Sequence, residues 1–208
     1  MKPNAIRLVR DCMPLRPLYY AEALRYAELQ AERFLALQGI DHPAVPESAI
    51  TTLPRVHVNR FTPFPLSGAA HWTEGRWMIA LNGAEPLTRQ RFSLAHEFKH
   101  VLDHRFIDVI YAEIPEAERD AMVERICDHF AACLLMPRTW VHAAYFGGTH
   151  GVTDLARMFG VSSSAMSIRL RHLGIKQAQP RCGPSRHVWR PAVPIRKQVP
   201  HRASHLVT

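Results

Sequence analysis

The sequence lacks several features that mark special classes of protein. It has no apolar run near the roughly 18 residues that a membrane-spanning helix needs. Residues 1–10 contain no apolar segment of the kind found in a secretory signal peptide. Four cysteines are widely spaced without a Cys-x-x-Cys pair, which argues against a disulfide framework and against a thiolate zinc site. We therefore expect a cytoplasmic protein without a membrane span, in which Cys127 and Cys133 are small core residues.

Acidic residues are missing from the C-terminal end of the chain. Residues 176–208 contain seven Lys or Arg and no Asp or Glu, whereas residues 1–175 carry 19 basic against 18 acidic residues. The formal net charge of +8 therefore belongs almost entirely to this tail. The tail is rich in proline and shows no apolar period, so we predict that it is disordered. It either contacts acidic partners or nucleic acid weakly, or is a solvated extension without a function of its own.

The composition of the chain, 47% hydrophobic and 21% charged, is typical of a globular protein. Apolar residues at helical spacing predict a helix from Tyr20 to about Gln38, which Gly39 is placed to end. Alternating residues predict short strands at residues 55–59, 69–73 and 76–82, with a turn at Glu74-Gly75. We expect an α+β fold in which a helix and a small antiparallel or mixed sheet pack on a helical core. His57 and His71 fall on strands and are expected at the surface.

The stretch His96-Glu97-Phe98-Lys99-His100 is the most informative part of the sequence. Apolar residues at helical spacing between residues 92 and 102 place it in the middle of a helix, with Thr88 as the expected N-cap. Two histidines four residues apart lie on one face of a helix, where both can bind the same metal ion. Glu97 then reaches a water molecule beside that ion. This spacing is typical of a zinc peptidase.

A zinc site for hydrolysis needs a third protein ligand and an open position for water. Glu124 is the best candidate, because it begins a run whose apolar residues follow a helical period until Pro137 breaks it. Asp128 lies one turn later on the same side, where it could accept a hydrogen bond from a ligand histidine. The alternative interpretation is that Glu124 and Asp128 form the solvated face of an amphipathic helix.

Residues 91–104 and 124–137 together resemble the ImmA/IrrE family of metallo-endopeptidases. With Asn82, Arg89 and a helix-turn-helix-like stretch behind the two motifs, the resemblance covers roughly residues 15–175. It implies zinc as the metal, with manganese left open, and Glu97 as the general base. The zinc ligands that it implies are His96, His100 and Glu124.

The resemblance also implies a division of the chain into three parts. We expect a zincin-like metallopeptidase domain at residues 1–150, a helix-turn-helix-like segment packed on the same domain at residues 151–175, and the basic tail at residues 176–208. The sequence departs at two places from the pattern of many members, which have Leu-Gly in place of Phe98-Lys99 and Asn in place of Asp128. Neither departure removes a ligand, although Lys99 adds a positive charge near the site.

The implied mechanism gives Glu97 two successive tasks. It takes a proton from the attacking water, which zinc activates as a Lewis acid, and passes this proton to the leaving amine. A further donor to the carbonyl oxygen is expected, and four candidates remain open: Tyr111, His129, Tyr145 and His150. His104 is expected beside the ligands or at the surface. The strand that ends at Asn82 is expected to bind the substrate backbone along its edge.

Two functions are compatible with these motifs. The family implies cleavage of a specific helix-turn-helix repressor, which releases genes for stress response or mobile-element transfer. The alternative is a non-proteolytic regulator or toxin–antitoxin component that binds DNA or a partner protein through residues 152–174. Candidates for facing DNA there are Ser163, Ser164, Ser167, Arg169 and Arg171. Glu97 favours the peptidase, since a structural zinc site closes its fourth position with a ligand and has no need of this carboxylate.

Overall fold

The structure is a computed structural model that describes residues 5–175. Over this range it has α+β architecture, with helices and a three-stranded mixed sheet, as the sequence predicts. The helices are α1 (Ala5–Arg10), α2 (Tyr20–Gln38), α3 (Ser48–Thr51), α4 (Leu87–Asp103), α5 (Ile107–Ile110), α6 (Glu116–Leu135), α7 (Arg138–Phe146), α8 (Val152–Phe159) and α9 (Ser163–His172). The strands are β1 (Val56–Phe61), β2 (Gly68–Thr73) and β3 (Arg76–Asn82). The predicted disordered tail lies outside the described residues.

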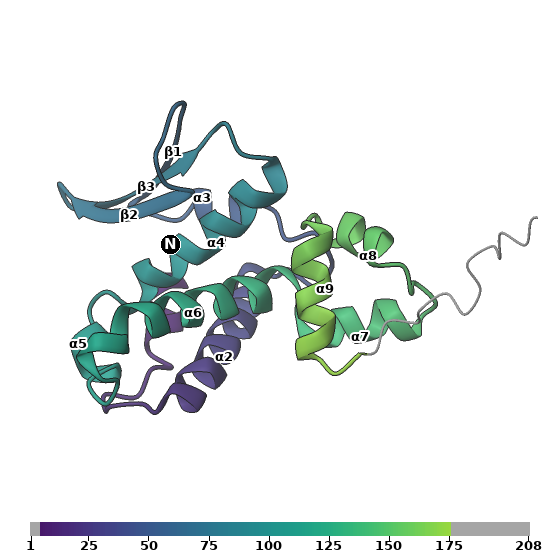
Figure 1. Ribbon diagram of the computed structural model, residues 1–208. Coiled ribbons are helices and arrows are strands. Elements are labelled where there is room, and N and C mark those ends of the chain that lie inside the picture. The colour runs from purple at the N-terminus through teal and green to yellow at the C-terminus, as the bar shows by residue number, and fades with distance from the viewer. Residues whose placement is uncertain (1–4, 176–208) are drawn as a thin grey trace, which may run out of the picture. The chain divides into compact units, whose positions relative to one another are not determined.

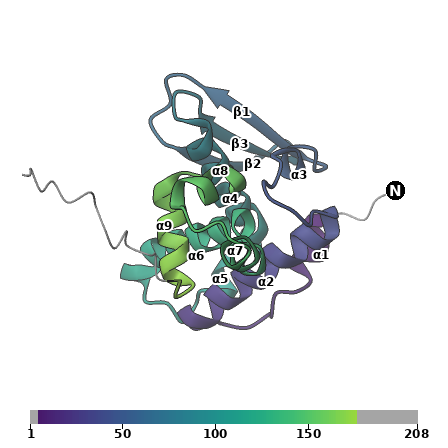
Figure 2. The same ribbon diagram turned by 90° about the vertical axis from the view of Figure 1, so that its right-hand side faces the viewer.

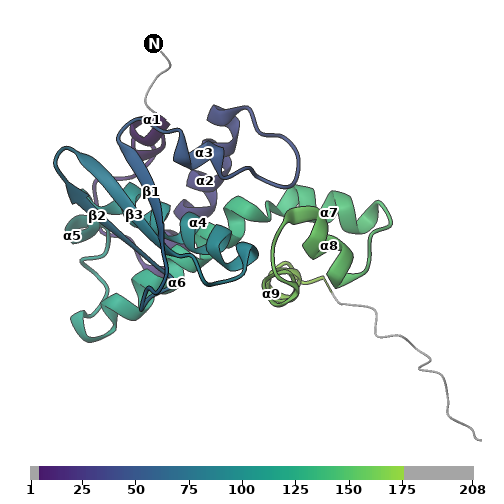
Figure 3. The same ribbon diagram turned by 90° about the horizontal axis from the view of Figure 1, so that it is seen from above.

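The sheet has the strand order β1-β3-β2, which the view from above shows side by side (Figure 3). Strand β3 pairs in parallel with β1 and antiparallel with β2. The predicted turn joins β2 to β3, and both of its residues, Glu74 and Gly75, have positive φ, as tight hairpin turns require. Because β3 is paired on both sides, the expectation that the strand ending at Asn82 offers a free edge to substrate is wrong. The free edges belong to β1 and β2.

Helix α4 lies between the sheet and two further helices (Figure 1). Strands β2 and β3 contact it on one side, and α6 packs against both α4 and α2 on the other. The ring of Phe98 on α4 joins this packing, because its centroid lies 4.8 Å from that of Phe34 on α2 and 6.2 Å from that of Phe130 on α6. All three rings are fully buried. This aromatic core fixes the face that α4 turns toward α6.

The observed ends of the helices match those predicted from the sequence only in part. Helix α2 runs from Tyr20 to Gln38 as predicted, and Gly39 ends it in the left-handed conformation with φ 66°. Helix α4 begins two residues earlier than expected, so the assignment of Thr88 as its N-cap is wrong. The carbonyl of Pro86 accepts from the first backbone amides, and no side chain caps this end. Helix α6 begins at Glu116 and so extends two turns ahead of residues 124–137, whose apolar period predicted a helix.

Helices α7, α8 and α9 follow α6 and lie together (Figure 2). The turn between α8 and α9 has the predicted glycine, since Gly160 is left-handed with φ 64°. Ser162 then caps α9 by accepting from the amide of Ala165 at 3.1 Å. Arg169 is not a DNA-facing residue, because it is 2% exposed and its Nε donates to the carbonyl of Met136 at 2.9 Å. Within residues 5–175, no helix has both the length and the apolar character needed to cross a membrane.

Candidate metal centre

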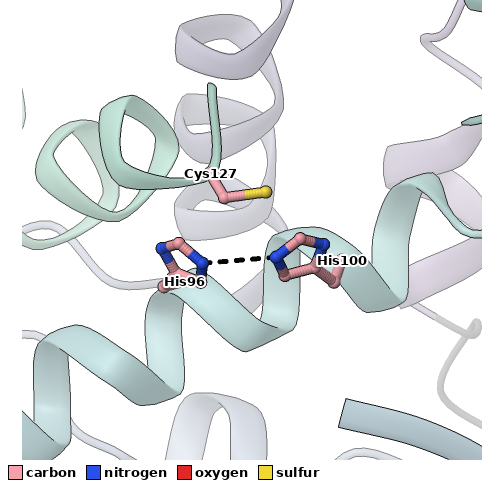
Figure 4. Close-up of side chains that lie close together, drawn as sticks. All are labelled: His96, His100 and Cys127. Carbon is pink, nitrogen blue, oxygen red and sulfur yellow. Dashed lines mark hydrogen bonds between the residues drawn. The ribbon is translucent and has the colours of Figure 1, made fainter. Parts of the chain in front are cut away.

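Helices α4 and α6 bring three metal-ligating side chains together. His96 and His100 project from adjacent turns of α4, and their Nε2 atoms lie 3.2 Å apart (Figure 4). The carboxylate of Glu124 on α6 contacts both rings, with Oε2 at 3.1 Å from His96 Nε2 and Oε1 at 3.3 Å from His100 Nε2. The predicted set therefore lies close together, and we call these three side chains the donor triangle.

The dimensions of this triangle fit a tetrahedral zinc ion. Zinc binds imidazole nitrogen and carboxylate oxygen at about 2.0–2.2 Å, so its ligand atoms lie roughly 3.3–3.6 Å apart. The three separations of 3.1, 3.2 and 3.3 Å come close to this range without a bound cation. The donor set also has the chemistry that zinc prefers, with two imidazoles and one carboxylate. The residues present thus fit a zinc ion with one open position.

Asp128 supports the ring of His96 from the side opposite the donor triangle. Its Oδ1 lies 2.9 Å from His96 Nδ1, so it accepts the hydrogen of Nδ1 and leaves Nε2 to face the metal position. Burial lowers the pKa of His96, but the hydrogen bond to Asp128 and the charges of Asp128, Glu124 and Glu97 outweigh it and raise the pKa. Burial and the neighbouring His96 lower the pKa of His100. His100 is therefore the ring more readily held neutral, the form that binds a metal.

Glu97 projects from α4 toward the start of β2. Its residue exposure is 8%, and burial raises the pKa of its carboxyl to about 7, with Glu124 adding to the rise against the opposing effect of His96. The carboxylate packs so tightly against Gly68, the first residue of β2, that a Cβ at that position would stand 2.8 Å from Glu97 Oε1. Gly68 thus makes room for Glu97, a role that the sequence did not reveal, and Figure 1 shows β2 lying over α4.

Lys99 points away from the metal position and into the core. Its side chain is 1% exposed, and Nζ donates to Gln30 on α2 and to Asp103 on α4, each at 2.7 Å. The hydroxyl of Tyr111 donates to the other oxygen of Asp103. We call these four residues the buried lysine cluster. The spacing of Lys99 and Asp103, four residues apart, was the sequence signal for it, and the pairing balances the charge that Lys99 brings.

The four candidates for an oxyanion donor lie in different surroundings. Tyr111 is 1% exposed and bonded to Asp103, and burial raises its pKa strongly, so its hydroxyl belongs to the core. His129 Nε2 contacts Cys133 Sγ on its own helix at 3.4 Å. Tyr145 and His150 pack edge to face with centroids 4.8 Å apart. None of these contacts joins a candidate to the donor triangle.

Three other histidines keep to the surface. His104 follows the last turn of α4, is exposed and packs edge-on against Trp77 at 4.9 Å between centroids. His57 and His71 lie on β1 and β2 and are exposed, as expected. The two imidazoles of the donor triangle are instead partly buried, with side-chain exposures of 14% for His96 and 27% for His100.

Known proteins resemble this chain in fold and in sequence. The structure is similar to that of a Mycobacterium tuberculosis transcriptional regulator, with a TM-score of 0.60 and 19% identity over 86% of this chain and 54% of that chain. This chain therefore spans about half the length of that regulator. Comparison with curated proteins finds no match. The family model of the IrrE N-terminal-like domain matches residues 54–171, more than half of the sequence, and the chain therefore belongs to the Peptidase_M78 family.

Proposed function

We propose that this protein is a zinc-dependent endopeptidase. The observation that carries the proposal is the donor triangle of His96, His100 and Glu124, with separations of 3.1–3.3 Å, beside the buried carboxylate of Glu97. The three donors would hold the metal and leave one position for water. Membership of a metallopeptidase family supports the same assignment.

The chemistry of hydrolysis divides between the metal and Glu97. A bound zinc ion supplies Lewis acidity, which favours ionisation of water and stabilises negative charge on the substrate carbonyl oxygen. Glu97 receives the proton of the attacking water at its carboxylate and delivers it to the leaving nitrogen. Its pKa of about 7 in the metal-free protein suits a group that must both accept and release a proton near neutral pH. Asp128 holds the ring of His96 in the tautomer that presents Nε2 to the metal.

The substrate would bind as an extended segment along the free edge of β2. Within residues 5–175, β2 pairs on one side with β3, and no strand pairs with its other side. An added strand on this edge gains backbone hydrogen bonds without demanding a particular sequence. Gly68 begins β2 in contact with Glu97, so a peptide running along this edge passes the proposed general base. The edge of β2 therefore replaces the strand ending at Asn82 as the substrate strand.

We further propose a helix-turn-helix transcriptional repressor as the substrate, whose cleavage derepresses stress-response or mobile-element genes. The resemblance of the two motifs to ImmA/IrrE proteins supports this substrate class. The proposed peptidase domain covers residues 1–150, and residues 151–175 form a helical segment packed on it. The bond from Arg169 to the carbonyl of Met136, at the end of α6, supports this packing role for α9.

The alternative is a regulator that binds DNA through α8 and α9 without proteolysis. Helices α8 and α9 with the left-handed Gly160 between them have the form of a helix-turn-helix. The burial of Arg169 removes one of its two candidate basic contacts, since Arg171 alone stays exposed. Glu97 also has no task in such a regulator. These two observations favour the peptidase.

The test is cleavage of the repressor encoded beside the gene for this protein. Zinc-loaded wild type should cut the repressor, and a chelator should stop the reaction. Glu97→Gln should bind zinc as wild type does and cut roughly 100- to 10,000-fold more slowly, because the proton acceptor is gone. The matched control is Glu118→Gln, which makes the same exchange at an exposed position in the first turn of α6 and should leave the rate unchanged. Cleavage that survives Glu97→Gln would contradict the proposal.

A further inference from the structure

The thiol of Cys127 lies next to the two imidazoles of the candidate metal centre. The ligand atoms of Cys127, His96 and His100 all lie within 4.8 Å of one another. Figure 4 shows the sulfur of Cys127, on α6, over the gap between the two rings on α4. Cys127 is 1% exposed, and throughout residues 5–175 no group forms a hydrogen bond with its thiol. A buried polar group without a hydrogen bond thus faces two nitrogen donors.

Glu124 and Cys127 both lie on α6 near the same two imidazoles, but they differ in exposure to solvent. They are three residues apart, so both project toward α4 from one face of the helix. The side chain of Glu124 is 59% exposed, which leaves its carboxylate free to turn into solvent at small cost. Cys127 is instead held in the core beside the rings. The pair of histidines therefore has two candidates for a third ligand, one exposed and one buried.

We propose that Cys127 is an alternative third ligand, so that the centre can hold a metal ion either as His2Glu with Glu124 or as His2Cys with Cys127. This inference rests on the metal centre of the proposed function. In the exchange the bond from the metal to the Glu124 oxygen breaks, a bond from the metal to the Cys127 sulfur forms, and the thiol proton passes to solvent. Carboxylate and thiolate each carry one negative charge, so the exchange leaves the charge of the centre unchanged.

The geometry requires a small movement for this exchange. Zinc binds thiolate at about 2.3 Å and imidazole at about 2.0–2.1 Å, which places sulfur and nitrogen roughly 3.5 Å apart in a tetrahedral site. A separation of up to 4.8 Å then closes with a shift of roughly an ångström, within reach of a side-chain rotation. A soft thiolate ligand favours zinc and its heavier relative cadmium over manganese or magnesium. The His2Cys state would therefore retain thiophilic ions selectively.

The experiment uses cobalt(II), which reports a sulfur ligand through a sulfur-to-cobalt charge-transfer band in the near ultraviolet. The full-length protein carries Cys12→Ser and Cys182→Ser throughout, to remove two cysteines that the proposal does not involve. In this background Glu124→Ala should bind one cobalt ion with a charge-transfer band and should not cleave the repressor. Glu124→Gln is a second variant at the same exposed position, and circular dichroism checks the fold of both.

The matched control distinguishes Cys127 from the other buried cysteine of α6. Cys133 is 2% exposed and contacts His129 rather than the donor triangle. Adding Cys127→Ser to Glu124→Ala should abolish the charge-transfer band and weaken cobalt binding by at least about 100-fold, more than the loss of a supporting residue costs. Adding Cys133→Ser instead should leave both the band and the affinity in place.

The outcomes separate this inference from the proposed function. If Glu124→Ala and Glu124→Gln bind no cobalt, or bind it without the sulfur band, Cys127 is a core residue and the inference is wrong. Metal binding and cleavage by the protein with Glu124 intact would still support the peptidase in that case. If the protein with Glu124 intact binds no metal, the metal centre itself is wrong and the inference falls with it.

Discussion

Helix α4 carries two polar clusters, and they differ in how their charges are balanced. One is the buried lysine cluster of Lys99, Asp103, Gln30 and Tyr111. The other is the donor triangle with its neighbours Glu97 and Asp128. The first contains one cation and one anion, with side-chain exposures of 1% and 3%. The second contains three carboxylates, and in the described part of the chain no Lys or Arg pairs with any of them.

The difference shows which cluster needs a partner from outside the protein. In the buried lysine cluster the charges of Lys99 and Asp103 balance each other. The cluster also links α4 to α2 and to Tyr111, so it holds α4 in place. The donor triangle and its neighbours bring acidic groups and imidazoles together without a Lys or Arg among the described residues, and a divalent metal ion would balance their charge. One face of the helix is therefore structural, and we propose that the other binds the metal.

Breaking the buried lysine cluster should give the largest effect on stability. Lys99→Met leaves Asp103 as a buried charge without its cationic partner, so we expect a loss of about 3–5 kcal/mol in the free energy of unfolding. The matched control is Arg157→Met, which breaks the exposed pair of Arg157 and Asp154 at 3.0 Å and should cost less than about 1 kcal/mol. Urea unfolding of the metal-free proteins measures both. Equal losses in the two variants would contradict the distinction between the clusters.

The carboxyl of Glu97, beside the donor triangle, should make the stability of the metal-free protein depend on pH. Burial raises the pKa of Glu97 to about 7 in the metal-free folded protein, against an ordinary value of 4.5. The folded state thus binds this proton more tightly, and the stabilisation is complete below pH 4.5 and is lost as the pH rises through about 7. As the pH rises over this interval, the free energy of unfolding of the metal-free wild type should fall by up to about 3 kcal/mol relative to that of Glu97→Gln.

Unfolding of the two proteins at a series of pH values measures this difference. A bound metal ion favours the ionised carboxylate, so zinc should reduce the loss. A constant difference between wild type and Glu97→Gln from pH 4.5 to 8 would show that the carboxyl is not perturbed.

A smaller effect, on zinc affinity, is expected from changes at Asp128, which accepts a hydrogen bond from His96. Asp128→Ala removes the acceptor of the Nδ1 hydrogen, and zinc affinity should fall by about 10- to 100-fold. Asp128→Asn keeps an oxygen that can accept this hydrogen and should stay closer to wild type. Competition with a chromophoric chelator measures all three affinities. An affinity of Asp128→Ala equal to that of wild type would remove Asp128 from the metal centre.

The elements with local sequence signals were predictable. Helix α2 ends where Gly39 allows it, and β3 has the predicted limits, because both follow from periodicity and turn chemistry within the segment itself. The same holds for His96 and His100, whose spacing on a helix requires that they share a face. The structure brings Glu124 and Asp128 to this face as predicted from the period of the second helix.

The features that depend on packing between distant segments were not predictable. Strand β3 has two neighbours, which no pattern within residues 76–82 could reveal. Arg169 turns into the core because the carbonyl of Met136, 33 residues earlier, accepts from it. Lys99 is buried because Gln30, Asp103 and Tyr111 come together around it from separate elements. The approach of Gly68 to Glu97 likewise joins two segments that only the fold brings into contact.

Metal content tests the central contrast most directly. Purified protein is loaded with zinc, freed of excess metal and analysed by elemental mass spectrometry. We predict one zinc ion per chain in the wild type and in Lys99→Met, and a large loss of zinc in His100→Ala. A wild type that retains no zinc, or a His100→Ala variant that keeps a full equivalent, would contradict the assignment of the donor triangle as a metal centre.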